Sequence, residues 1–247
     1  MQDFKFKNDT YSIHSSMGYD EGLRKYFLNI YLLMSVALLI TAISAFAVLS
    51  IPTLKMIIYQ CTPYGEIIGM TSIGWLIAFA PLGISLFFTF ALNRIDARTA
   101  QMLFWLYAML IGISLSSLGF LYTGESLVKT FLICASTFGA MSLYGYTTEK
   151  SLASMGSFLY MGLVGLIITS LINFFMQSPA IEFALSLIGV LIFTGLIAYD
   201  TQKLKDLYLS GGLNNNYISI IAAFTLYLDF INLFLYLLKF LGQKRDN

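Results

Sequence analysis

The chain has 247 residues, of which 58% are hydrophobic and 11% charged, and its mean hydropathy is +0.78. A soluble domain carries about 25% charged residues, so this chain cannot cover its surface with polar groups and must have lipid as part of its solvent. The net charge of +1, without a basic patch, gives no sign of nucleic-acid binding. The two cysteines lie far apart and no Cys/His cluster occurs, so neither a metal site nor a cofactor is expected.

A polar N-terminal tail, residues 1–25, precedes a transmembrane domain, residues 26–247. Within that domain seven apolar segments are long enough, or nearly so, to cross about 30 Å of hydrocarbon. The connections are short apart from 50–71 and 200–216 and leave no room for a soluble domain. The sequence therefore predicts an all-α integral membrane protein with seven transmembrane helices, at 26–49, 72–92, 99–122, 127–146, 155–176, 181–199 and 217–241.

The distribution of lysine and arginine predicts the orientation. Counting the tail and alternate loops, nine of these residues lie on the side of the N-terminus and five on the other side. This favours a cytoplasmic N-terminus. Seven crossings then place the C-terminus outside. However, three of the five Lys and Arg residues counted on the outer side lie close to the C-terminus. A last segment that enters the membrane and returns without crossing would place the C-terminus inside as well.

Asp229 stands in the middle of the last apolar segment. A charged Asp at a helix centre costs roughly 2.5–3.5 kcal/mol on insertion scales, so it normally faces a protein interior or a water-filled path and marks a functional site. Thr225 precedes it, and Asn232 and Tyr236 follow it, at helical spacing, so all share one face. This polar stripe predicts that the last helix is shielded from lipid, with its stripe toward an interior path. The plainer alternative is a hydrogen-bonded Asp that only fixes packing.

Asp200 ends the sixth segment and is the second acid placed at or within the membrane. It could instead be a solvated helix-end residue beside Lys203. If the last two helices start at one level, Asp200 and Asp229 differ in depth by roughly 18 Å. Contact therefore requires the last helix to start lower, or the sixth to continue past Tyr199. If the two carboxylates meet, they repel, share a proton and titrate as one pair.

Three segments carry a resemblance to a known family: LYLDFINLFLYLLKFLG at 226–242, AYDTQKLK at 198–205 and FGAMSLYGYTTEKSL at 138–152. Together they resemble the Bax inhibitor family, also called transmembrane Bax-inhibitor-motif proteins. The opening YDEGLRKYFLNIYLLMS at 19–35 is similar to bacterial members. The resemblance covers most of the chain.

The resemblance implies seven helices with the last one central and six around it. It also implies a proton-sensitive leak of calcium ions in a bacterial inner membrane, with Asp200 and Asp229 as the pH sensor. Arg94 is the nearest match to an arginine that latches one aspartate in the closed state, although its local sequence is not distinctive. Some relatives carry an acid inside the second span, which this chain lacks between residues 72 and 92.

Three functions can be weighed, of which the first is a pH-gated cation leak. Calcium is the expected ion, because hard cations prefer oxygen ligands. The second is a non-conducting regulatory protein: animal members of the family suppress cell death, and a bacterial relative modulates a membrane protease. The third, an intramembrane aspartyl protease, needs Gly-x-Gly before the second aspartate, whereas Leu226-Tyr227-Leu228 precedes Asp229. The sequence thus predicts no enzyme.

Overall fold

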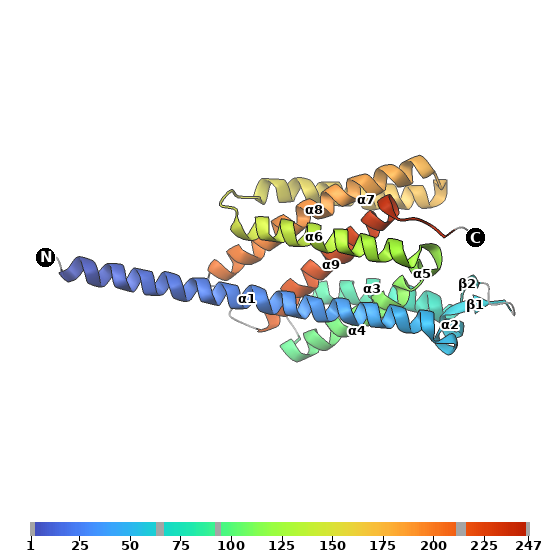
Figure 1. Cartoon of the computed structure of the whole chain (residues 1–247), viewed down its shortest axis with the longest axis horizontal. Coiled ribbons are helices and arrows are strands. Elements are labelled where there is room, and N and C mark those ends of the chain that lie inside the picture. The colour runs from blue at the N-terminus through green and yellow to red at the C-terminus, as the bar shows by residue number, and fades with distance from the viewer. Residues whose placement is uncertain (1–2, 63–66, 92–94, 211–215, 246–247) are drawn as a thin grey trace.

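The computed structural model describes the chain apart from residues 1–2, 63–66, 92–94, 211–215 and 246–247. Side chains are described for 21–62, 67–87, 95–210 and 217–245. In the part of the chain whose backbone is described, nine helices and two short strands follow one another (Figure 1): α1 Asp3–Ser50, α2 Pro52–Ile58, β1 Tyr59–Cys61, β2 Ile67–Met70, α3 Ser72–Ala91, α4 Ala97–Leu115, α5 Leu118–Leu121, α6 Gly124–Thr147, α7 Ala153–Met176, α8 Pro179–Leu209 and α9 Asn216–Leu241.

Six of the described helical stretches are long and apolar enough to cross a membrane, and they correspond to six of the seven expected segments. Helices satisfy their own backbone hydrogen bonds, which lipid cannot do, so apolar runs of this length form helices. The remaining segment forms α3, whose described apolar part is the shorter Ser72–Phe87. The seventh crossing stays a prediction.

The structure differs from the sequence-based prediction in two places: the start of the first helix, and a β-hairpin that was not predicted. Helix α1 begins at Asp3, so the segment interpreted as a tail is continuous with the first span. Its last turn before the span already belongs to the core, since Leu23 is buried. The all-helical expectation also omitted a β-hairpin, in which β1 pairs antiparallel with β2. The buried Tyr59 anchors this hairpin, because its hydroxyl hydrogen bonds with Ser116 at 2.9 Å.

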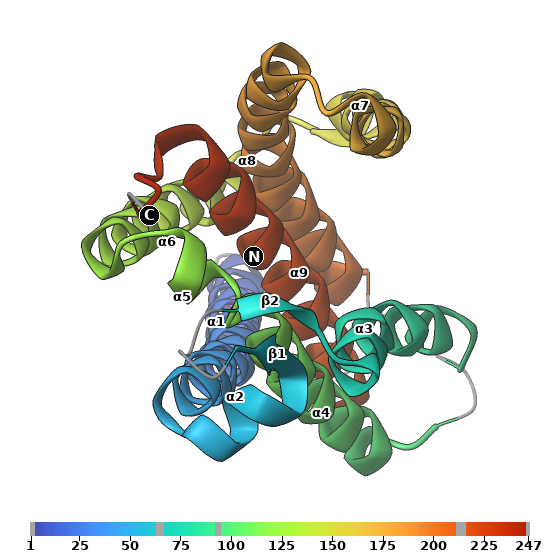
Figure 2. The same cartoon turned by 90° about the vertical axis from the view of Figure 1, so that its right-hand side faces the viewer.

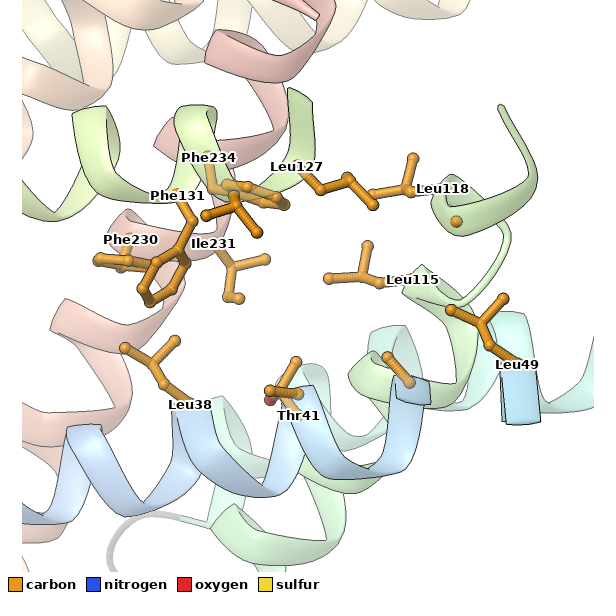
Figure 3. Close-up of a pocket in the computed structure, with 14 residues that line it drawn as sticks. Leu38, Thr41, Leu49, Leu115, Leu118, Leu127, Phe131, Phe230, Ile231 and Phe234 are labelled. Carbon is orange, nitrogen blue, oxygen red and sulfur yellow. The ribbon is translucent and has the colours of Figure 1, made fainter. Parts of the chain in front are cut away.

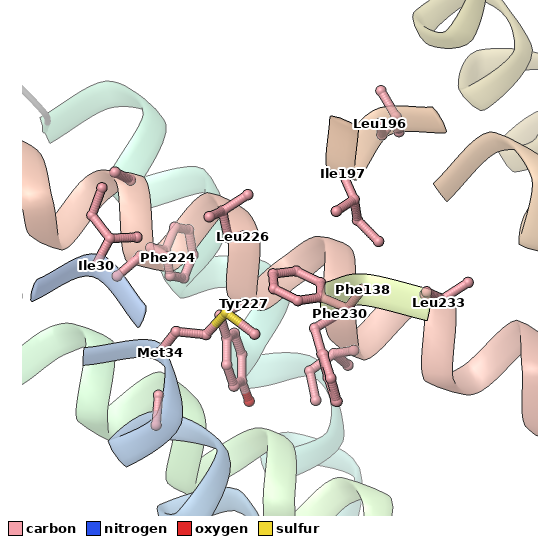
Figure 4. Close-up of a cluster of buried hydrophobic side chains, with 14 of the residues drawn as sticks. Ile30, Met34, Phe138, Leu196, Ile197, Phe224, Leu226, Tyr227, Phe230 and Leu233 are labelled. Atoms are coloured by element: carbon pink, nitrogen blue, oxygen red, sulfur yellow. The ribbon is translucent and has the colours of Figure 1, made fainter. Parts of the chain in front are cut away.

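The helices pack in a definite order around the last two. Helix α9 packs against α1, α4, α6 and α8, whereas α7 packs on α8 and α3 on α4 (Figure 2). The largest buried cluster lies where α1, α6 and α8 meet α9, with Met34, Phe138, Ile197 and Tyr227 among its members (Figure 4). The arrangement implied by the resemblance, six helices around the last, stays a prediction.

The two ends of the bundle can be told apart by the contacts between connections. At one end, here called the hairpin end, the C-terminal segment meets the α5–α6 connection: Thr123 N donates to Gln243 O at 3.2 Å and Arg245 N to Leu121 O at 2.9 Å. At the other, the α6–α7 end, Gln202 of α8 holds the 148–152 connection. Helix α9 is a single helix between them and does not turn back within Asn216–Leu241. The side of the membrane on which the C-terminus lies stays a prediction.

This arrangement predicts which positions are labelled together. In a background without Cys61 and Cys134, we expect Ser151→Cys and Ser210→Cys to react with an impermeant thiol reagent from one side of the membrane. Lys244→Cys should react from the opposite side, because it lies at the hairpin end. With a cytoplasmic N-terminus, labelling of intact cells from outside would reach Lys244→Cys alone. Labelling of all three from one side would contradict the continuous crossing of α9.

Candidate functional site

The carboxyl groups of Asp200 and Asp229 lie side by side inside the bundle. Asp200 is 4% exposed and Asp229 6% exposed. They are close enough for each carboxyl group to act electrostatically on the other. The depth difference expected between them is removed because α8 continues past Tyr199 to Leu209. Of the two geometries that the sequence left open, contact is achieved by the longer sixth span.

The end of α8 is held in place by the connection between α6 and α7. The Gln202 side chain accepts a hydrogen bond from Leu152 N at 2.7 Å and donates to Lys150 O at 2.9 Å. Lys205 Nζ donates to Tyr146 O at 2.8 Å. Helix α6 approaches so closely that a Cβ on Gly145 would collide with the carbonyl oxygen of Ala198. These contacts fix the stretch of α8 that carries Asp200.

A proton shared by the two carboxyl groups stays a prediction. An ionised carboxylate only accepts hydrogen bonds, so two of them can bond to each other only when one is protonated. Tyr160 of α7 donates its hydroxyl to Asp200 Oδ1 at 3.3 Å. Asp229 Oδ2 is buried and has no hydrogen-bond partner among the described atoms. The pair is therefore a polar site with one acceptor left open.

The charges around the pair do not neutralise it. Lys203, one turn further along α8, acts on Asp200 through space, and its ammonium lies 5.9 Å from the centre of the Tyr199 ring. Neither aspartate takes part in a salt bridge with any described residue. Arg94, the expected latch, lies outside the described residues, and its role stays a prediction.

The other three residues of the predicted stripe do not reach the carboxyl groups. Thr225 Oγ1 donates to Ile221 O at 3.1 Å, and Asn232 Nδ2 donates to Leu228 O at 2.8 Å, both within α9. Tyr236 stacks on Phe193 of α8, with 5.6 Å between ring centroids. All three are partly buried rather than enclosed. Their part in an ion path stays a prediction.

Sequence reasoning missed the groups that other helices contribute. Tyr160 gave no local signal, because a tyrosine in an apolar span resembles any lipid-facing aromatic residue. A hydrogen-bond chain also joins three helices next to the pair, from Tyr31 to Ser142 at 2.6 Å and from Ser142 to Thr201 at 3.1 Å. Ser142 and Thr201 stand inside the motif segments, which is the signal that could have singled them out.

A family model described as "Inhibitor of apoptosis-promoting Bax1" matches residues 23–246. The chain belongs to the Bax inhibitor-1 family. The resemblance drawn from the three motif segments is thereby confirmed. Together with its apolar helices, family membership makes the chain an integral membrane protein.

Bacterial relatives match this Bax inhibitor-1 family protein over nearly its whole length. The uncharacterized protein RP147 of Rickettsia prowazekii is 52% identical over 230 residues, which are 92% of this chain and 93% of the relative. An uncharacterized protein of Caulobacter vibrioides is 42% identical over 94% of each chain. The inner membrane protein YbhL of Escherichia coli is 40% identical over 91% of this chain and 94% of the relative.

Proposed function

We propose that the protein is a pH-sensitive cation leak of the bacterial inner membrane, with calcium as the transported ion. The observation that carries this proposal is the buried pair of Asp200 and Asp229, on neighbouring helices, with no salt-bridge partner among the described residues. Ionisable residues within membrane spans are costly and mark ion pathways and proton relays. Carboxylate oxygens are also the ligands that calcium prefers.

In this proposal the pair is the pH sensor and no reaction is catalysed. Carboxyl groups that share a proton titrate as one unit, so one protonation event changes the charge that the ion path presents. Thr225, Asn232 and Tyr236 are supporting polar groups of the path, and Arg94 is a latch for one carboxylate. The N-terminus is cytoplasmic in this proposal, so the α6–α7 end of the bundle is the cytoplasmic end.

The direct test is calcium flux into liposomes that contain the purified protein. We expect leak to change across roughly pH 6–8, where an isolated Asp, with a pKa of about 3.9, would show nothing. The sign of the change depends on whether protonation breaks a cation site or releases a latch. A pH profile that persists in the Asp200→Asn, Asp229→Asn double variant would contradict the sensor assignment.

The second candidate is a non-conducting regulatory protein that modulates a membrane protease or a stress or cell-death response. The observation that favours it is the family description, which names an inhibitor of a cell-death protein. This function would survive the loss of both carboxylates. Purified protein that gives no calcium flux at any pH, together with cellular function retained by the double variant, would favour it over the leak.

A further inference from the structure

A second polar region lies between α7, α8 and α9 toward the hairpin end. It is a cavity of about 370 Å³ whose polar lining comes from the end of α7, the start of α8 and the end of α9: Ser170, Asn173, Gln177, Glu182, Ser186 and Lys239. By contrast, the cavity of about 290 Å³ between α1, α6 and α9 is lined almost entirely by apolar side chains such as Leu38, Phe131 and Phe234 (Figure 3). The first cavity therefore suits polar contents and the second apolar contents.

The polar lining lies where water can reach it. Glu182 is in the first turn of α8 and Lys239 in the last turn of α9, both side chains are exposed, and neither takes part in a salt bridge with a described residue. The cavity is large enough for several waters, each of which needs two to four polar partners. Two serine hydroxyls, two amides, a carboxylate and an ammonium group provide those partners. The lining thus fits water and a hydrated cation better than a lipid tail.

Two stacked rings lie at the wall of this cavity. Tyr236 forms part of the cavity wall, and its ring lies against Phe193 at 5.6 Å with an interplanar angle of 22°. A Cβ on Gly189 would collide with the Tyr236 ring, so only glycine lets the ring lie this close to α8. Lys239 places its ammonium 5.7 Å from the same ring.

The spacing on both helices puts these rings in line with the carboxyl pair. Phe193 precedes Asp200 by seven residues and Tyr236 follows Asp229 by seven. Seven residues are about two helical turns, or about 10 Å, so each ring lies on the same face as its aspartate. Because α8 and α9 run in opposite directions, both rings lie on the hairpin-end side of the pair. The order along the α8–α9 contact is therefore cavity, ring pair, carboxyl pair.

We propose that the α7–α8–α9 cavity is a water-filled vestibule for hydrated cations and that the Tyr236–Phe193 ring pair is the barrier between it and Asp200 and Asp229. The lining has one negative and one positive charge, Glu182 and Lys239, and Glu182 is the group that a hydrated cation would meet there. The role in conduction rests on the proposed leak function. The presence of water in the vestibule and the position of the barrier do not depend on the leak function, because both can be measured without ion flux.

Thiol reactivity tests the vestibule. In the full chain without Cys61 and Cys134, Ser170→Cys should react with a charged, membrane-impermeant methanethiosulfonate at least about tenfold faster than Leu171→Cys, because the reactive thiolate forms in water and not in lipid. Leu171 is the matched control, as it is adjacent on α7 and 61% exposed on the lipid-facing surface. Equal rates at the two positions would overturn the vestibule, whether or not the protein conducts.

The barrier is tested at Asn232, which lies between the ring pair and Asp229 along α9. The reagent is supplied at the hairpin end. Asn232→Cys should react slowly when Tyr236 is present and also when it is combined with Tyr236→Phe. Combined with Tyr236→Ala, it should react about tenfold faster. Tyr236→Phe keeps the ring and so separates its loss from loss of the hydroxyl. An unchanged rate in Tyr236→Ala would overturn the barrier. In flux assays Tyr236→Ala should raise the basal calcium leak. If the wild-type protein leaks calcium and Tyr236→Ala leaks no more, the barrier is rejected while the proposed leak function stands.

Discussion

We expect Asp229→Asn alone to flatten the pH dependence of calcium leak as fully as the Asp200→Asn, Asp229→Asn double variant does. Asn keeps nearly the same shape as Asp but cannot ionise, so the partner loses the group with which it shares a proton. Residues that act as one unit show strongly non-additive effects. The measurement is calcium entry into proteoliposomes across about pH 5–8, with equal amounts of folded protein.

The matched control is Asp206→Asn. It removes a carboxylate from the same helix, α8, but from an exposed position beyond the pair. We expect it to leave the profile as in the wild type. Each single substitution could instead flatten the pH dependence of calcium leak by half, with full flattening only in the double variant. That result would show that the carboxyl groups titrate independently. That outcome would retain a carboxylate sensor and reject the shared proton.

The second large effect is expected on stability, from Gly145→Ala. Alanine is favoured over glycine in a helix by about 1 kcal/mol, yet this Cβ would press on the carbonyl of Ala198 and force α6 away from α8. Overpacking of this kind costs about 1–3 kcal/mol, so the net change should be destabilising. It should appear as a lower thermal unfolding midpoint of the detergent-solubilised protein.

Gly139→Ala provides the comparison on the same helix. Nothing lies within 4 Å of a Cβ built at Gly139, so only the helix-propensity gain remains and the midpoint should stay or rise. If both substitutions lower the midpoint equally, the effect belongs to α6 itself and not to its contact with α8. Gly145→Ala should also alter the pH profile, because Ala198 is one half-turn from Asp200.

How much of this molecule could be read from its sequence depends on the range of the interactions. The spans were predictable because an apolar run of some twenty residues in lipid has to form a helix. Asp229 was predictable as a site because a carboxylate in such a run is costly. The continuation of α8 past Tyr199 was not, since it depends on Gln202 holding residues 148–152, which lie about fifty positions earlier.

Other features had no local signature at all. Tyr160 reaches Asp200 across 40 positions, and a single aromatic residue in α7 does not reveal which way it points. The β-hairpin is also short, and its anchor is a contact between Tyr59 and Ser116. The stacking of Tyr236 on Phe193 becomes meaningful only once α8 and α9 are placed side by side.

The burial of α9 has a consequence for biosynthesis. Its most apolar stretch is 67% buried, against 11% to 39% for the other five spans, yet it is the last to leave the ribosome. Until it is inserted, the faces of α1, α4, α6 and α8 that pack on it have only lipid or one another to contact. A nascent chain that stops after α8 would therefore expose Asp200 without its partner, and such truncated chains should be recognised by membrane quality-control proteases while the full-length protein persists.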